Sequence, residues 1–102
     1  MPDGFENTKL LREMVEGETC YFRASGFSFK GSRVQPELWV ETDYRVWIKD
    51  DSPHNNIPIT KRGDQIWIPD QYRPKIEREI SLGGGSRFDV DGPAKALPVV
   101  FV

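Results

Sequence analysis

Residues 7–16 carry apolar side chains at the spacing of an α-helix. Asn7 or Thr8 can cap the start of such a helix, and Gly17 stands where a left-handed residue commonly ends one. Four apolar residues fall at i, i+1, i+4 and i+5 and so share one helical face: Leu10, Leu11, Met14 and Val15. The pattern predicts one helix near the N-terminus, over about 7–16.

Beyond Gly17 the apolar positions follow the alternation and the short β-branched or aromatic runs that are typical of strands. The segments expected as strands are 19–24, 27–30, 38–40, 44–49, 57–60, 65–68, 76–82, 88–90 and 97–102. They predict a mainly β chain, with α+β as the alternative. The expected architecture is a small barrel or sandwich of about six or seven short antiparallel strands with the N-terminal helix, in a single domain spanning 1–102.

An Arg-Gly-Asp tripeptide at 62–64 stands between two of the expected strands. Ile59 and Ile66 flank this segment, and Gly63 at its centre suits a hairpin turn that needs a positive φ. Integrin recognition, the adhesive function of this tripeptide, requires an extracellular setting, and the N-terminal sequence lacks the basic and apolar regions of a signal peptide. We therefore interpret the tripeptide as a turn.

Charge and hydropathy narrow the classes of partner. The net charge of the 102 residues is −2, so no overall field attracts nucleic acid or an acidic membrane. No apolar run approaches the ~20 residues that span a bilayer. With no signal peptide recognised, the sequence predicts no membrane partner, and a location in the cytoplasm or within an intracellularly assembled particle.

Catalytic chemistry has little support in the sequence. A nucleophilic Cys–His pair would have to combine Cys20 with His54, since the chain has one cysteine and one histidine. Cys20 lies in an aromatic run where a thiol usually behaves as a small hydrophobe. A metal site at 50–56, a calcium loop at 89–92 and a phosphate loop at 83–86 each lack the required spacing of ligands. We predict no enzyme activity, no cofactor and no metal site.

The last residues, 96–102, form an apolar run, whereas a free end is normally polar and frayed. This run can pair within its own sheet or add a strand to the edge of a neighbouring subunit. Aromatic rings on outer strand faces can also anchor a protein interface. The candidate partner-binding residues are Trp47, Val99, Val100, Phe101 and Val102.

These features predict a non-enzymatic protein-interaction or assembly module, whose partner is another protein or a further copy of the chain. A structural subunit of a virion-like or other multi-subunit particle fits them, and so does a small protein inhibitor.

A second hypothesis comes from the segment 21–33, in which aromatic residues alternate with cations. Single-strand nucleic-acid binders combine ring platforms with a basic groove in this way. The alternative function is therefore single-stranded nucleic-acid binding by a small β-barrel, less favoured because Phe27 and Phe29 share a face as core residues do. Its candidate residues are Tyr21, Phe22, Arg23, Phe27, Phe29, Lys30 and Arg33.

Overall fold

The computed structural model describes residues 7–24, 27–30, 37–50, 56–82, 86–87 and 96–102, with the backbone alone at 28–30, 37 and 86–87. The strand expected at 88–90 lies outside these residues, as do Arg33 and His54. So do most of the candidate ligand loops at 50–56, 83–86 and 89–92.

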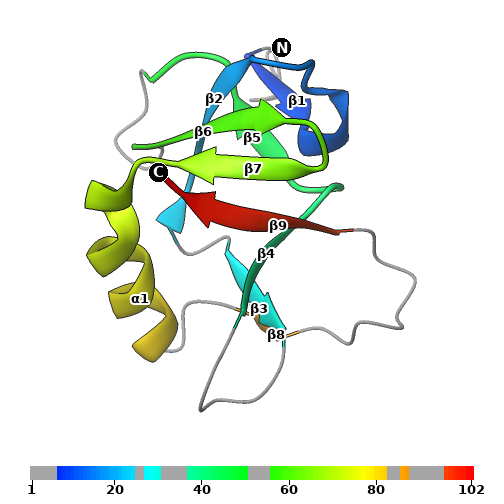
Figure 1. The fold of residues 1–102 in the computed structure, drawn as a ribbon. Helices are drawn as coiled ribbons and strands as arrows, with labels where there is room; N and C mark the ends of the chain where they lie inside the picture. The colour runs from blue at the N-terminus through cyan, green and yellow to red at the C-terminus, as the bar shows by residue number, and fades with distance from the viewer. Residues whose placement is uncertain (1–6, 25–26, 31–36, 51–55, 83–85, 88–95) are drawn as a thin grey trace, which may run out of the picture.

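Nine strands and one α-helix make up the regular structure of the described residues (Figure 1). The α-helix is α1 (Arg73–Ser81), and two 3-10 turns cover Leu11–Glu13 and Asp70–Tyr72. The strands are β1 (Thr8–Leu10), β2 (Thr19–Phe22), β3 (Ser28–Lys30), β4 (Glu37–Glu41), β5 (Arg45–Trp47), β6 (Ile57–Arg62), β7 (Gln65–Ile68), β8 (Ser86–Arg87) and β9 (Ala96–Phe101).

These strands form one sheet in the order β1-β5-β2-β6-β7-β9-β4-β3-β8. β5 and β4 lie at opposite sides of the run β5-β2-β6-β7-β9-β4, yet residues 42–44 alone connect them. The sheet therefore has to curl until its flanks approach one another, and it forms a half-barrel. The mainly β class is confirmed. The expectation of antiparallel strands alone is wrong, because β7–β9 and β3–β8 are parallel pairs.

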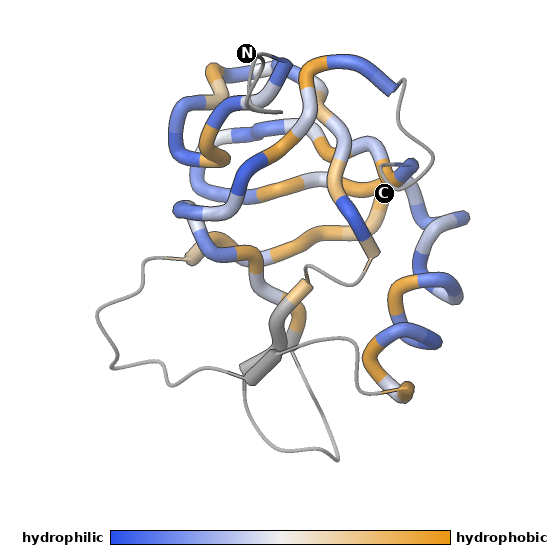
Figure 2. Tube along the Cα trace, turned by 180° about the vertical axis from the view of Figure 1, so that it is seen from behind, coloured by the Kyte–Doolittle hydropathy of each residue, from blue (hydrophilic) through white to orange (hydrophobic). Residues whose placement is uncertain are grey.

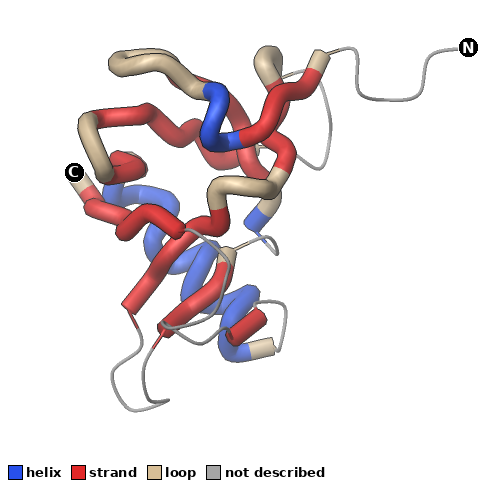
Figure 3. Tube along the Cα trace, turned by 90° about the vertical axis from the view of Figure 1, so that its right-hand side faces the viewer, coloured by secondary structure: helices blue, strands red, loops and turns tan. Residues whose placement is uncertain are grey.

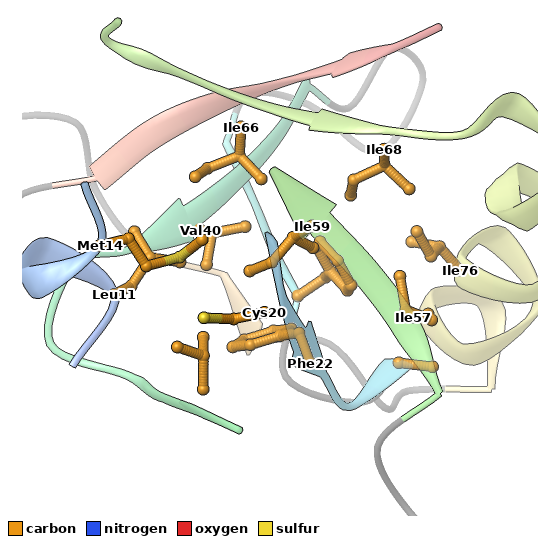
Figure 4. Close-up of a cluster of buried hydrophobic side chains, with 13 residues drawn as sticks. Leu11, Met14, Cys20, Phe22, Val40, Ile57, Ile59, Ile66, Ile68 and Ile76 are labelled. Atoms are coloured by element: carbon orange, nitrogen blue, oxygen red, sulfur yellow. The ribbon is translucent and has the colours of Figure 1, made fainter. Parts of the chain in front are cut away.

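The core fills the inside of this curl with aliphatic and aromatic side chains (Figure 4). Apolar and polar residues alternate along several strands (Figure 2), because successive side chains point to opposite faces of a sheet. The buried hydrophobic residues are Leu11, Met14, Cys20, Phe22, Ala24, Phe27, Val40, Val46, Ile57, Ile59, Ile66, Ile68 and Ile76.

Two short segments cover the core from opposite sides. Leu11 and Met14, which follow β1, reach it from one side, and Ile76 of α1 reaches it from the other (Figure 4). Tyr72 and Ile80 also pack against the core, so α1 runs beside the strands (Figure 3). Most of the folding free energy of such a short helix has to come from this packing.

The helix predicted over 7–16 is wrong. Residues 8–10 form β1, which pairs with β5, and a 3-10 turn follows it. The apolar spacing was real at Leu11 and Met14, which are three residues apart and both buried, whereas Val15 is 64% exposed. A 3-10 turn places residues i and i+3 on one side, so two buried residues do not require an α-helix.

The strand predicted over 76–82 is also wrong, because most of this segment belongs to α1. Tyr72, Ile76 and Ile80 stand four residues apart, which puts them on one helical face toward the core. Pro74 lies in the first turn of the helix, where its missing N–H costs nothing. Leu82, the last residue of that expected strand, is 76% exposed.

The hairpin prediction at the Arg-Gly-Asp tripeptide is confirmed. β6 and β7 pair up to Arg62 and Gln65, so Gly63 and Asp64 form a two-residue loop. Gly63 has φ +57°, and among the described residues no residue other than glycine has a positive φ. A positive φ at the first loop position alone is the pattern of a type II′ turn.

Candidate binding surface

All three tryptophans of the chain lie on the outer face of the sheet, and each is half-buried. Because successive strand residues point to opposite faces, Trp39, Trp47 and Trp67 point away from the core. Each directly follows a strand residue that packs into or against the core: Leu38, Val46 and Ile66.

Two of these tryptophans belong to a continuous apolar patch across β7, β9 and β4. Trp67 lies opposite Val100 in the parallel pair β7–β9. Pro98 is two residues before Val100 on the same face, and it lies opposite Trp39 of β4. We call these four residues, Trp39, Trp67, Pro98 and Val100, the Trp67 patch; all four are half-buried.

Neighbouring polar groups hold the Trp67 ring in place. Its indole Nε1–H donates a hydrogen bond to Gln65 Oε1 at 2.9 Å. The Arg62 guanidinium lies over the ring, 5.6 Å from its centroid, and pairs loosely with Glu16 at 3.9 Å. An exposed cation–π contact of this kind contributes about 0.5–1 kcal/mol. A ring that is already positioned loses less side-chain entropy when it binds a partner.

A second group of outward residues lies across β2 and β5. Tyr21 and Trp47 are direct cross-strand partners, and Pro58 of β6 lies opposite Tyr21 on its other side. Because β2 and β5 are antiparallel, Arg23 (two residues after Tyr21) and Arg45 (two before Trp47) lie at the same end of this pair. Both arginines are exposed. We call Tyr21, Arg23, Arg45 and Trp47 the Trp47 patch.

The structure divides the predicted partner-binding residues between two faces. The apolar tail is β9, which pairs with β7 and β4 inside its own sheet, so it is not available as a donated strand. Val99 and Phe101 pack against the core. Val102 continues the ladder, since its N–H donates to the Ile68 carbonyl. Trp47 and Val100 face outward from the sheet, and Val102, just past the end of β9, is 59% exposed.

The residues predicted to bind nucleic acid are also divided between the core and the outer surface. Phe22 and Phe27 are buried and stack edge to face, with ring centroids 4.9 Å apart, so neither ring is open to a base. Tyr21 and Arg23 lie on the outer surface. Phe29 and Lys30 belong to β3, of which only the backbone is described.

The one cysteine lies in the core beside a partly exposed ion pair. Lys9 Nζ donates to Glu18 Oε2 at 2.7 Å, and this bond lowers the pKa of Glu18 and raises that of Lys9. Burial, assisted by the charge of Glu18, raises the pKa of the Cys20 thiol to about 11. The thiol therefore stays protonated near neutral pH, whereas a nucleophilic cysteine reacts as the thiolate.

Other kinds of site have little basis in the described part of the chain. There, no three His, Cys, Asp or Glu side chains gather closely enough to hold a metal ion. Among the same residues, no helix has the length and apolar character needed to cross a membrane.

Comparison of the chain with protein-family models, curated proteins and solved structures found no match. The surface chemistry of the chain itself is therefore the basis on which a function can be proposed.

Sequence reasoning missed Trp39, Trp67 and Pro98 as candidate contact residues. The signal was present, because Trp39 and Trp67 each stand between two aliphatic residues, as in Leu38-Trp39-Val40 and Ile66-Trp67-Ile68. In a strand with aliphatic residues on the core face, the residue between them faces outward.

Proposed function

We propose that this chain is a non-enzymatic protein-interaction module, which binds another protein chain through the Trp67 patch. One observation carries the proposal: all three tryptophans lie outside the core, and Trp67 is held between Gln65 and Arg62 beside Val100 and Pro98. Tryptophan side chains held in apolar surroundings are among the commonest anchors of protein interfaces.

The chemistry of the patch supports a protein partner. Its four residues are apolar or aromatic, and the indole N–H already has a hydrogen-bond acceptor in Gln65. Single exposed apolar residues are common on proteins, but a continuous group rimmed by polar residues is typical of an interaction site. The roles considered from the sequence, a subunit of a multi-subunit particle and a small inhibitor, both use a surface of this kind.

The burial and the raised pKa of Cys20 support a non-enzymatic role. The one cysteine of the chain is fully buried, and its raised pKa keeps it protonated. A Cys–His mechanism would need an accessible thiol of lowered pKa.

The test compares the full chain with Trp67→Ala and with Val15→Ala as bait in an extract of the source cells. Val15 is a matched control because it is apolar and 64% exposed but lies outside the patch. Proteins that depend on Trp67 are then purified and titrated by calorimetry, and self-association is measured by light scattering. We expect Trp67→Ala to weaken binding by about 2 kcal/mol or more, roughly thirtyfold, and Val15→Ala to change it little.

Either of two results would overturn the proposal. In the first, no protein and no second copy of the chain binds in a way that depends on Trp67. In the second, Val15→Ala weakens binding as much as Trp67→Ala does, which would point to a general loss of folded protein. Thermal unfolding of each variant identifies that second case.

A further inference from the structure

We infer that the Trp67 patch binds an exposed segment of its protein partner in which an Asp or Glu side chain stands about three residues from an apolar one. Arg62 and Gln65 bind the carboxylate, and the apolar side chain packs on Val100 and Pro98 beside Trp67. This assignment rests on the protein interaction proposed above and names the chemistry of the partner. Two neighbouring side chains with open N–H donors at the edge of the patch carry it.

Arg62 and Gln65 lie side by side next to the Trp67 ring. They are direct cross-strand partners at the end of β6 and β7, and both contact the ring. They share its outer face, since Trp67 lies opposite Thr60, two residues before Arg62. Both side chains are exposed. The patch therefore has a polar edge on its β6 side and apolar residues on its β9 side.

The N–H groups of Arg62 are not taken up within the described residues. A guanidinium carries five N–H donors in a planar fork that fits a carboxylate. The described carboxylate that pairs with Arg62 is that of Glu16, at 3.9 Å, which is too long for a hydrogen bond. Glu16 is held elsewhere, because its Oε1 accepts the Gly63 N–H at 2.6 Å. A carboxylate from a partner can therefore form the short bonds with Arg62 that Glu16 does not form.

Gln65 adds two donors beside this fork. The indole N–H of Trp67 can only donate, so the Gln65 atom that it reaches at 2.9 Å is the side-chain oxygen. The Nε2 amide group of Gln65 is on the other branch of the side chain, and it makes no hydrogen bond among the described residues. Open donors on two neighbouring side chains suit a carboxylate, since a carboxylate only accepts.

Long-range attraction has little part in this recognition. Among the described residues at the hairpin tip, Lys61 and Arg62 are matched in charge by Glu16 and Asp64. The Lys61 ammonium donates to a backbone carbonyl of the loop, and Asp64 is exposed and forms no ion pair with any described residue. Binding of the carboxylate therefore depends on direct hydrogen bonds and not on a net field.

The order of the strands sets the distance between the acid and the apolar residue. Arg62 is on β6 and Val100 is on β9, and β7 alone lies between these strands. Adjacent strands are about 4.8 Å apart, so the two positions are roughly 10 Å apart across the sheet. An extended segment advances about 3.3–3.6 Å per residue and covers this distance in about three residues. The segment crosses the strands, because β7 and β9 are each paired on both sides and cannot accept an added strand.

The probe is a library of random short peptides displayed on phage. The C-terminus of each peptide is joined to the coat protein, so that side chains supply the carboxylates. The library is selected in parallel on the full chain, on Trp67→Ala and on Arg62→Ala. We expect the wild type to select peptides with Asp or Glu about three residues from an aromatic or aliphatic residue. Trp67→Ala should not retain these peptides, and Arg62→Ala should select peptides without the preference for an acid.

A selected peptide is then synthesised with an amidated C-terminus and titrated with each variant. Arg62→Ala should weaken binding roughly tenfold or more, and so should replacing the acid of the peptide with its amide. Both changes together should weaken binding little more than either alone, because each removes the same contact. This coupling separates the lost carboxylate contact from a displaced Trp67 ring. Lys75→Ala is the control for charge, because Lys75 is an exposed cation on α1.

Glu16→Gln should change the affinity in the opposite direction. Glutamine keeps an oxygen for the Gly63 N–H but no longer competes as an anion for Arg62. We expect the peptide to bind about twofold to fivefold more tightly, which corresponds to the loss of a weak surface ion pair. Weaker binding by Glu16→Gln would contradict the assignment of the carboxylate to Arg62.

Three further results would overturn the inference. The first is selection of Trp67-dependent peptides that lack the acid, or that are rich in proline or in basic residues. The second is equal loss of affinity with Arg62→Ala and Lys75→Ala, which would mean a general effect of charge. The third is that no displayed peptide binds in a way that depends on Trp67. Failure of the proposed function is seen separately, as the absence of any whole protein whose capture depends on Trp67.

Discussion

Gly63 determines how β6 connects to β7. A side chain at this position would meet no atom within 4 Å, so space does not require glycine. The backbone does require it, since φ is +57° and L residues with side chains rarely adopt that conformation. The Arg-Gly-Asp tripeptide is thus held by its glycine, while Arg62 contacts Trp67 and Glu16 within the chain.

Gly63→Ala should lower the free energy of unfolding by about 1–2 kcal/mol, because alanine is strained at this φ. Asp64→Ala is the control, since the second loop position has no positive φ and should change stability by less than about 0.5 kcal/mol. Chemical denaturation of the three proteins measures both effects. Equal stability of Gly63→Ala and the wild type would contradict the type II′ turn.

The ion pair between Lys9 and Glu18 makes stability depend on pH. Glu18 has a lowered pKa in the folded chain, so its contribution is present above the unfolded value near 4.5 and is lost as pH falls through the folded pKa. Lys9 has a raised pKa, so its contribution is lost only above about pH 10.5. Between these limits both groups are charged, and the pair is fully formed.

Glu18→Gln should therefore destabilise the chain at pH 7 by about 1 kcal/mol or less, as expected for a partly exposed pair. The difference from the wild type should shrink as pH falls through the lowered folded pKa of Glu18, because the wild-type carboxyl is then protonated too. Urea denaturation at pH 7 and pH 3 measures this. A difference of the same size at both pH values would show that the charge of Glu18 is not what stabilises the fold.

At the scale of elements, α1 shows where sequence patterns are ambiguous. Ile76, Ile80 and Leu82 are at even spacings, which fit a strand, but Ile76 and Ile80 are also four apart, which fits a helix. Tyr72 and Pro74 resolve the ambiguity in favour of the helix, since Tyr72 extends the helical face and Pro74 suits a first turn.

Substitutions at Ile76 and Leu82 distinguish a helix from a strand over 76–82. Ile76→Ala removes a fully buried side chain and should cost about 2–5 kcal/mol. Leu82→Ala should cost less than about 0.5 kcal/mol, because Leu82 is 76% exposed past the helix end. Equilibrium unfolding of both variants measures the loss of stability at each position. Comparable losses at the two positions would favour the strand over the helix.

Other elements could be predicted because their signals are local. The strand 65–68 follows from Ile66 and Ile68 alternating with Gln65 and Trp67, and the hairpin before it follows from Gly63. The position of β9 between β7 and β4 could not be predicted, because it depends on pairing between segments far apart in the chain. The Trp67 patch depends on the same pairing, since Val100 meets Trp67 only through it.

At the scale of the whole molecule, the curled sheet separates two kinds of side chain. Aliphatic residues and Phe22 and Phe27 fill the inside, while the tryptophans lie outside. A core built in this way does not need the tryptophans, so their place on the outer face has to be explained by another role. Binding is the role that we propose, with apolar contacts on the Trp67 patch.

The most direct test of this account is the accessibility of the tryptophans in the folded chain, measured by acrylamide quenching of their fluorescence. Variants with two of the three tryptophans changed to phenylalanine report on Trp39, Trp47 and Trp67 one at a time. We predict that each is quenched in the native state to a substantial fraction of its value in the urea-unfolded chain. Tryptophans protected from acrylamide, as in a closed core, would contradict the outward placement on which the proposed protein-binding site depends.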